Sequence, residues 1–266
     1  MVIVDNSSTD NTKEVAGLFI KKYLNFRYIR ESAQGLSHAR NRGYKEALGE
    51  YVAYIDDDAK AAPDWIERIL RAFKTIKPEP VAVGGEIHPW YEIAPPAWFT
   101  DDFEIRTWGR EKGFLQPPRA QYGFSGSNMI LKKKTLEQYG GFSSDYGMVG
   151  RKIRLGEEAA LFYRIYQDHP FFWYDPEIKV EHWVPAKNMR VGYHLKRAYV
   201  GGVTIAGITG GSVFTILTTI MSLSFRVSTL PLRVRWWHKY WQRSFLKHAQ
   251  PIAGSMGFLR SSLFGM

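Results

Sequence analysis

The chain has 266 residues, of which 45% are hydrophobic and 15% are aromatic, and this composition excludes an intrinsically disordered protein. Its length is sufficient for one globular domain with an appendage. The formal net charge is +10, and no cysteine is present. The lack of cysteine excludes a disulfide framework and a thiolate metal site, and it fits a reducing compartment.

Two segments near the N-terminus place polar residues at the ends of predicted elements. Residues 2–4 form an apolar strand that runs into a polar turn at residues 5–10, where a hydroxyl or carboxylate side chain is suited to cap the next helix. Residues 37–43 open a second, short helix that ends near Gly49. The alternation of strand and helix predicts an α/β domain.

The most informative segment is the apolar run at residues 51–55 and the three carboxylates after it. The run predicts an interior parallel strand, and Asp56, Asp57 and Asp58 follow at its C-terminal end, where open α/β sheets bind ligands. Adjacent carboxylates repel one another unless a cation or hydrogen-bond donors neutralise them. We therefore expect a divalent metal, held mainly by Asp58 with help from Asp56. A solvated acidic turn is the alternative.

Positive charge is concentrated in the C-terminal part of the chain. Residues 182–266 contain eleven Lys and Arg and no carboxylate, so the remainder has a net charge of −1. Residues 198–225 carry no charge, and residues 233–243 combine cations with tryptophan and tyrosine. This pattern is typical of a segment held at an anionic membrane surface. We divide the chain into a globular domain, residues 1–197, and a basic, aromatic helical tail, residues 198–266.

The sequence is compatible with several placements of this tail. Residues 198–225 exceed the roughly 20 residues that span a bilayer, but their glycine and hydroxyl content favours an in-plane or re-entrant segment on the cytoplasmic face. A helix buried against the globular domain is an alternative. Aromatic residues among cations also suit stacking on nucleic acid. No recognised nucleic-acid-binding motif accompanies them, so we do not expect that partner.

Three motifs in the N-terminal half resemble those of the inverting family-2 glycosyltransferases, which have the GT-A fold. That family has a strand ending in V-D-x-x-S-x-D, a G-x-x-x-A-R-N-x-G segment and a D-x-D at the next strand end. The corresponding segments here are residues 4–10, 35–43 and 56–58. Residues 126–129, 140–142 and 156–158 resemble later motifs, so the resemblance covers about residues 1–202. Each motif is weak alone, whereas their common order and spacing are specific.

The resemblance implies a Rossmann-like GT-A fold with a mostly parallel sheet flanked by helices. It implies an enzyme that transfers a sugar, with inversion, from a UDP- or GDP-sugar to a glycan or lipid-linked acceptor in the synthesis of cell-surface polysaccharide or glycolipid. Mn²⁺ or Mg²⁺ would neutralise the departing diphosphate. The residues expected to bind the nucleotide sugar are Asp5, Asn6, Arg40, Asp56 and Asp57. As an alternative, Arg40 is a surface charge on its helix.

Further roles follow from the same resemblance. Glu158 stands where the family has the general base, although the family residue there is Asp, and Glu157 is the second choice. Both carboxylates could instead cap the following helix. His182 matches a histidine that is a further metal ligand in the family, with an ordinary strand-end histidine as the alternative. Asn128 lies in the segment that resembles the acceptor side.

An insert rich in aromatic residues and proline, residues 89–118, is a second expected acceptor element. Rigid aromatic faces suit stacking on sugars, and Trp98 is the residue chosen for this role. The family pattern also places one strand and helix before residues 2–4, and this chain begins inside that pattern. We therefore expect unpaired strand edges beside residues 2–4 and 51–55. A non-catalytic nucleotide-binding or scaffold protein at the membrane is the alternative function.

Overall fold

The computed structural model describes residues 1–118, 120–150 and 154–265, and it divides into two compact units. The first unit comprises residues 1–87 and 106–180, and the second comprises residues 88–105 and 181–266. The boundary expected at residue 198 falls inside a helix of the second unit. The assignment of residues 1–197 to a catalytic domain stays a prediction.

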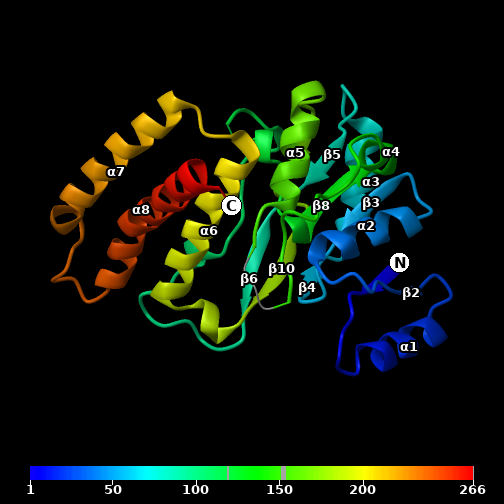
Figure 1. Cartoon of the computed structure of the whole chain (residues 1–266). Helices are drawn as coiled ribbons and strands as arrows, with labels where there is room; N and C mark the ends of the chain where they lie inside the picture. The colour runs from blue at the N-terminus through cyan, green and yellow to red at the C-terminus, as the bar shows by residue number, and fades with distance from the viewer. Residues whose placement is uncertain (119, 151–153, 266) are drawn as a thin grey trace. The chain divides into compact units, whose positions relative to one another are not determined.

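The first unit consists of short strands alternating with helices (Figure 1). Its strands are β1 (Val2–Asp5), β2 (Arg27–Arg30), β3 (Tyr51–Tyr54), β4 (Ala59–Ala61), β5 (Ala82–Gly84), β7 (Gly113–Phe114), β8 (Met129–Lys132) and β9 (Phe172–Tyr174). Its helices are α1 (Thr12–Lys22), α2 (Leu36–Glu46), α3 (Trp65–Thr75), α4 (Lys133–Gln138) and α5 (Glu157–Asp168), with short 3₁₀ turns η2 (Ala120–Tyr122) and η3 (Gly126–Asn128).

The main sheet of this unit is mixed. Its order is β3-β8-β5-β9-β7, in which β5 and β9 are parallel while the β3–β8, β5–β8 and β7–β9 pairs are antiparallel. The predicted α/β class is correct, but the expectation of a mostly parallel sheet is wrong. So is the expectation that residues 51–55 form an interior parallel strand, because β3 ends the order and pairs antiparallel with β8. An apolar run indicates burial but carries no information on strand direction.

The N-terminal strands form a separate ladder. β1 and β2 pair in parallel, from Val2 opposite Arg27 to Asp5 opposite Arg30. Within the described residues, no sheet joins β1 to β3.

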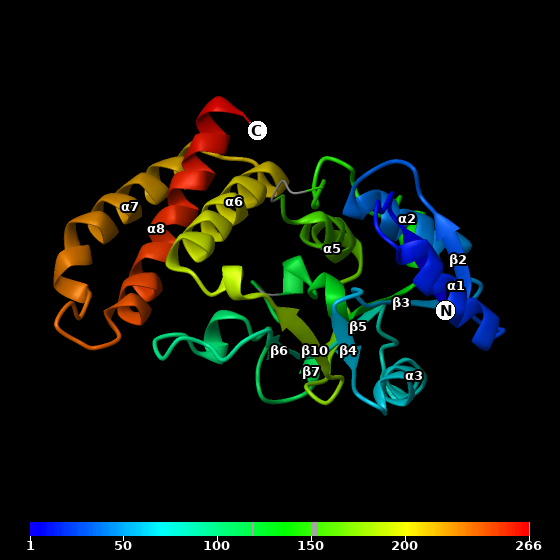
Figure 2. The ribbon, with the colours of Figure 1, turned by 90° about the horizontal axis from the view of Figure 1, so that it is seen from below.

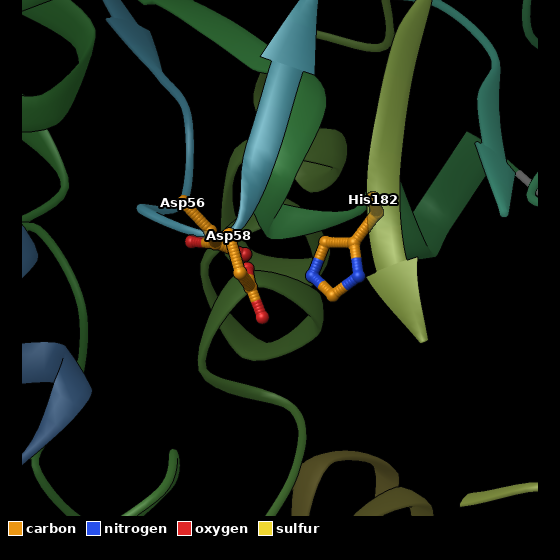
Figure 3. A group of neighbouring side chains, drawn as sticks. All are labelled: Asp56, Asp58 and His182. Atoms are coloured by element: carbon orange, nitrogen blue, oxygen red, sulfur yellow. The ribbon is translucent and has the colours of Figure 1, made fainter. Parts of the chain in front are cut away.

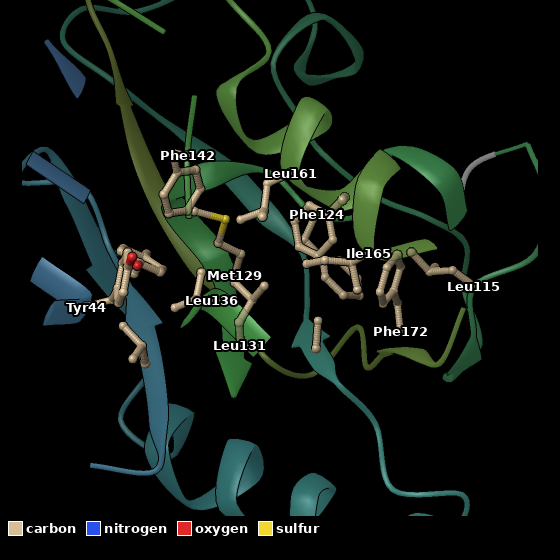
Figure 4. Packing of buried hydrophobic residues seen from close by; sticks show 14 of the residues in the cluster. Tyr44, Leu115, Phe124, Met129, Leu131, Leu136, Phe142, Leu161, Ile165 and Phe172 are labelled. Atoms are coloured by element: carbon tan, nitrogen blue, oxygen red, sulfur yellow. The ribbon is translucent and has the colours of Figure 1, made fainter. Parts of the chain in front are cut away.

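Side chains from both faces of the main sheet are buried. Met129 and Leu131 of β8 pack with Leu161 and Ile165 of α5 and with Phe172, and Figure 4 shows these side chains together. Ile130, on the opposite face, belongs to a second cluster that contains Ile69 and Phe73 of α3. Alternation along β8 therefore fixes α5 on one face of the sheet and α3 on the other. This packing sets the position of the first turn of α5.

The second unit is largely helical. It contains most of β6 (Ile87–Tyr91) and β10 (Val180–Val184), the turns η1 (Asp101–Phe103) and η4 (Ala186–Asn188), and the helices α6 (Val191–Thr209), α7 (Val213–Arg233) and α8 (Trp241–Phe264). β10 and β6 are neighbours in one sheet. α6 and α8 lie side by side in both views (Figures 1 and 2). Glycine makes this close approach possible, since a Cβ on Gly257 would lie 2.0 Å from the carbonyl oxygen of Tyr199.

The uncharged stretch at residues 198–225 is not one helix. α6 ends at Thr209, Gly210 has a φ of +70°, and α7 starts after Ser212, whose Oγ accepts a hydrogen bond from the Thr215 N–H at 3.1 Å. Among the described residues, the helix that is long and apolar enough to cross a membrane is α7, with a mean hydropathy of 1.5. The apolar segment is therefore shifted toward the C-terminus relative to the stretch chosen from sequence.

Candidate functional site

Charged side chains from three elements of the first unit converge on one guanidinium. Arg40 is on α2, Asp56 follows β3, and Glu157 and Glu158 are in the first turn of α5. Gly156, with a φ of +95°, begins α5 in a backbone conformation that favours glycine. The positive end of the helix dipole stabilises the two carboxylates in its first turn.

Arg40 is the centre of this group. Its side chain is 7% exposed; Nη1 donates to Glu157 Oε1 at 2.5 Å, and Nη2 donates to Asp56 Oδ1 at 3.4 Å. Glu158 Oε2 lies 3.9 Å from Nη1. Arg40 is therefore not a surface charge. Glu157 lies in the first turn of α5, as the helix-cap alternative requires, and it also contacts the buried guanidinium of Arg40.

Glycine leaves the space that the guanidinium occupies. A Cβ built on Gly126 would lie 2.0 Å from Arg40 Nη2, closer than real side chains allow. The carbonyl oxygen of Arg40 accepts a hydrogen bond from Tyr54 Oη at 3.3 Å, which ties α2 to β3. Gly126 therefore has a direct steric role beside Arg40. From the sequence it belonged to a segment that resembles the acceptor side.

The two glutamates differ in environment. Burial, then the charge of Glu158, raises the pKa of Glu157 to about 8, against the opposing effect of Arg40. Burial alone would lower the pKa of Arg40, but Asp56, Glu157 and Glu158 outweigh it and the pKa is raised. Glu157 is 5% exposed, whereas Glu158 is 23% exposed and lines a cavity of about 330 Å³. Glu158 is therefore the carboxylate that a bound molecule can reach.

Asp56, Asp58 and His182 offer a ligand set for a cation. One ligand atom from each lies within 4.8 Å of the others, and all three residues are half-buried (Figure 3). His182 Nδ1 lies 3.1 Å from the carbonyl oxygen of Trp183, and the tautomer in which Nδ1 donates to that oxygen leaves Nε2 as the nitrogen suited to bind a cation. Two carboxylates and one neutral imidazole suit Mn²⁺ and are compatible with Mg²⁺.

The other predicted donor-binding residues are placed as follows. Asp5 accepts from Tyr28 Oη at 2.5 Å and from the Ser8 N–H at 2.8 Å, and the bond from Tyr28 is the largest of the effects that lower its pKa. Asn6 Nδ2 donates to the Ala33 carbonyl at 2.7 Å, and its Oδ1 accepts from the Gly35 N–H at 2.6 Å. Asp57 is exposed. Asn6 thus holds the loop before α2, whereas Asp5 joins the end of β1 to β2 and to the turn that follows β1.

Asn128 makes internal contacts rather than lining an open surface. It is fully buried; its Oδ1 accepts from Trp65 Nε1 at 2.9 Å and its Nδ2 donates to the carbonyls of Glu86 and Ile178. Its predicted contact with the acceptor has no support from this placement. A buried amide and an exposed one share the same sequence signature, so sequence could not separate the two roles.

Trp98 lies in the second unit, in ring contact with Phe99 and Phe103. The cavity beside Glu158 is lined instead by Trp108 and Tyr122. The sequence signal for Trp108 was present, because it lies in the same aromatic insert, but composition did not indicate which tryptophan reaches the site. Contact of Trp98 with an acceptor stays a prediction.

Comparisons with known proteins agree with this geometry. A model of glycosyl transferase family 2 matches residues 1–140. A glucosyl-dolichyl phosphate glucuronosyltransferase of Haloferax volcanii is 32% identical over 140 residues, which cover 53% of this chain and 44% of that protein. The succinoglycan biosynthesis protein ExoM of Rhizobium meliloti is 24% identical over 214 residues, covering 77% of this chain and 63% of that protein. Less than two thirds of either relative is matched.

Solved structures support the fold. A mannosyltransferase from Pyrobaculum calidifontis, solved in complex with GDP-Man and Mn²⁺, has a TM-score of 0.58 at 16% identity, over 99% of this chain and 77% of that chain. The S. aureus TarS structure with UDP-GlcNAc has a TM-score of 0.53 at 14% identity, over 94% of this chain and 72% of that chain. These similarities confirm the predicted GT-A fold.

Gly126→Ala is expected to destabilise the first unit, because the added methyl group must displace the guanidinium of Arg40 from its carboxylates. We expect a loss of about 1–3 kcal/mol in the free energy of unfolding, as for other overpacked sites, measured by urea titration. Gly17→Ala is the matched control, since nothing lies within 4 Å of a Cβ at that helical position. Equal stability of Gly126→Ala and the parent chain would contradict the steric role.

Glu157→Gln is expected to flatten the pH dependence of stability. Because the pKa of Glu157 is raised from 4.5 to about 8 on folding, the folded chain retains a proton that the unfolded chain releases between these values. The stabilisation is fully present below the lower value and is lost as the pH rises toward the upper one, by at most about 1.4 kcal/mol per pH unit. Urea unfolding across this range measures the slope.

Glu67→Gln is the control for this measurement, because Glu67 is 68% exposed on α3. It should retain the slope of the parent chain. If Glu157→Gln also retains that slope, Glu157 is not the group responsible.

Proposed function

Because the chain belongs to glycosyl transferase family 2, we propose that it transfers a sugar, with inversion, from a UDP- or GDP-sugar to a glycan or lipid-linked acceptor. The observation that carries this proposal is the carboxylate group around Arg40, which combines a cation-binding pair with a carboxylate open to a cavity. The relatives named for glucosyl-dolichyl phosphate and for succinoglycan support acceptors of this class.

Asp58, Asp56 and His182 would hold Mn²⁺ or Mg²⁺, which supplies positive charge to the departing diphosphate. The structural relative solved with GDP-Man and Mn²⁺ supports this choice. Asp56 Oδ1 also accepts from Arg40 Nη2 at 3.4 Å, a contact that helps to orient the carboxylate. Such support of a ligand by a second polar group increases metal affinity.

Glu158 is proposed as the general base. The proton of the acceptor hydroxyl passes to the Glu158 carboxylate while the acceptor oxygen forms its bond to the anomeric carbon and the bond from that carbon to the diphosphate breaks. One displacement of this kind inverts the anomeric configuration. Arg40 is proposed to position Asp56 and the α5 carboxylates, because its guanidinium contacts them.

The second unit is proposed to bind the cytoplasmic face of a membrane through α7 and the segment after it. The outward side chains Phe214, Leu217 and Met221 are 76%, 55% and 72% exposed. Arg226, the sole charged residue of α7 before its last residue, is half-buried and donates to Ser222 Oγ. Trp237, 85% exposed in the basic segment that follows, suits the headgroup region. The charge-free outward face favours lipid contact.

Removal of one metal ligand is expected to weaken donor binding. Asp58→Ala leaves the cation with fewer oxygen ligands, so the metal-dependent part of the affinity for UDP or GDP should fall about 10-fold or more. Calorimetric titration with Mn²⁺ and with EDTA measures this part. Asp64→Ala, at a carboxylate of the same unit whose side chain is 44% exposed, is the control. Equal metal-dependent affinity of Asp58→Ala and the parent chain would exclude Asp58 as a ligand.

Glu158→Gln is expected to abolish turnover and leave donor binding nearly unchanged. The amide retains the shape of the side chain but cannot accept the proton of the acceptor, and loss of a general base costs about 10²-fold or more in kcat. Turnover is followed as release of UDP or GDP, with Glu67→Gln as the matched control. If Glu158→Gln is active and Glu157→Gln is inactive, the two roles are reversed. Absence of turnover in the parent chain favours the non-catalytic alternative.

Substitution of the outward face of α7 is expected to release the protein from anionic vesicles. Replacing Phe214, Leu217 and Met221 by Ser removes side chains that each contribute about 1.5–3 kcal/mol when buried, so bound protein should fall at least tenfold in a flotation assay. Ser at Leu18 and Leu24, exposed on and after α1, is the control. Equal flotation of the α7 variant and the parent chain shows that α7 is not the membrane contact.

A further inference from the structure

Trp108 lines two cavities of the first unit. The cavity that contains Glu158, here the base-side cavity, has a volume of about 330 Å³ and is lined on its other walls by Tyr122 and Ser125. A second one, here the outer cavity, has a volume of about 300 Å³ and is lined by Trp108, Glu111, Gln116 and Tyr174 among others. The shared tryptophan makes these two spaces neighbours.

The residues on both sides of Trp108 contact one phenol. Tyr174 Oη donates to the Gly109 carbonyl oxygen at 2.9 Å and lies 3.1 Å from Thr107 Oγ1. The indole ring contacts Phe124 at a centroid distance of 5.4 Å and Tyr174 at 5.8 Å. Trp108 is thus a preorganised aromatic wall, which loses little conformational entropy when a ligand packs on it.

The outer cavity pairs this wall with polar groups near solvent. Glu111 and Gln116 are exposed, and Gln116 Nε2 donates to the Phe114 carbonyl at 3.2 Å, which orients the amide. A carboxylate and a carboxamide are suited to bind the hydroxyl groups of a sugar, and an aromatic wall is suited to contact its C–H face. Both cavities are at the small end of the range for ligand sites, about 300–1,000 Å³, as expected for one sugar unit each.

We propose that the outer cavity is a second acceptor subsite, which binds the sugar next to the one that reacts. The base-side cavity receives the sugar whose hydroxyl gives its proton to Glu158, and the outer cavity receives the adjoining unit of the chain across Trp108. The acceptor is then at least a disaccharide. This inference rests on the proposed function, because it takes Glu158 as the base.

The test compares binding of methyl hexosides with binding of the corresponding α- and β-linked methyl disaccharides. Ligand-observed NMR is carried out on the full chain with Mg²⁺ and UDP or GDP. We expect one or more disaccharides to bind about 10-fold more tightly than their monosaccharides, as for an added aromatic contact. The double variant Glu111→Gln, Gln116→Ala should lose this preference, and Trp108→Ala should weaken binding of both sugars.

Two controls separate the outcomes. Gln167→Ala removes an exposed amide that also donates to a backbone carbonyl, on α5, and should retain the preference. Octyl hexosides test whether an alkyl chain, rather than a second sugar, occupies the outer cavity. Equal binding of monosaccharides and disaccharides, an unchanged preference in the double variant, or a gain from the octyl chain alone would overturn the proposal.

Hydrolysis of UDP-GlcNAc or GDP-mannose without acceptor distinguishes this inference from the proposed function. The double variant should hydrolyse the donor at the parental rate, since neither substituted residue lies in the carboxylate group around Arg40. If the parent chain hydrolyses donors but shows no preference for a disaccharide, the subsite alone is wrong. If it binds disaccharides preferentially but neither transfers nor hydrolyses, the proposed function fails and the sugar site remains.

Discussion

A buried cation is the interaction on which the site depends. Removing a guanidinium from water costs several kcal/mol unless well-placed anions surround it, and Arg40 is 7% exposed. Its carboxyl partners come from separate parts of the chain, at Asp56 after β3 and at Glu157 and Glu158 on α5. Arg40 therefore links α2, the end of β3 and the start of α5, and the same carboxyl groups serve the proposed chemistry.

Two consecutive glutamates point in different directions because a helix turns by about 100° per residue. Glu157 faces inward, contacts Arg40 and has a pKa raised chiefly by burial. Glu158 faces the cavity and stays partly exposed. The family residue at that position is Asp, and the longer side chain here reaches from the same helix turn to both the cavity and the edge of the guanidinium. Position on the helix therefore decides which carboxylate meets a ligand.

Motif spacing predicted the α/β class, and it selected several residues that lie close together in the structure. Asp56, Asp58 and His182 were chosen from strand ends and resemblance, and the structure brings them together. Strand direction in the main sheet was not predictable, because an apolar run has the same pattern in either direction. Nor was the burial of Asn128, since its three partners are 42 to 63 residues away. The break between α6 and α7 occurs at Gly210 and Gly211. In the sequence these glycines indicated only that the uncharged stretch is less hydrophobic.

The proposed cation site and the proposed membrane contact place opposite requirements on surface charge. A site that holds a cation and a base needs carboxylates, and a carboxylate-rich surface is repelled by anionic lipid. The acidic residues all precede His182, and the basic excess lies beyond them. Attraction to an anionic surface can then act on residues that take no part in neutralising Arg40 or in holding the metal. Separation along the sequence would let the proposed membrane contact change by substitution in α7 and α8 without altering the carboxylates around Arg40.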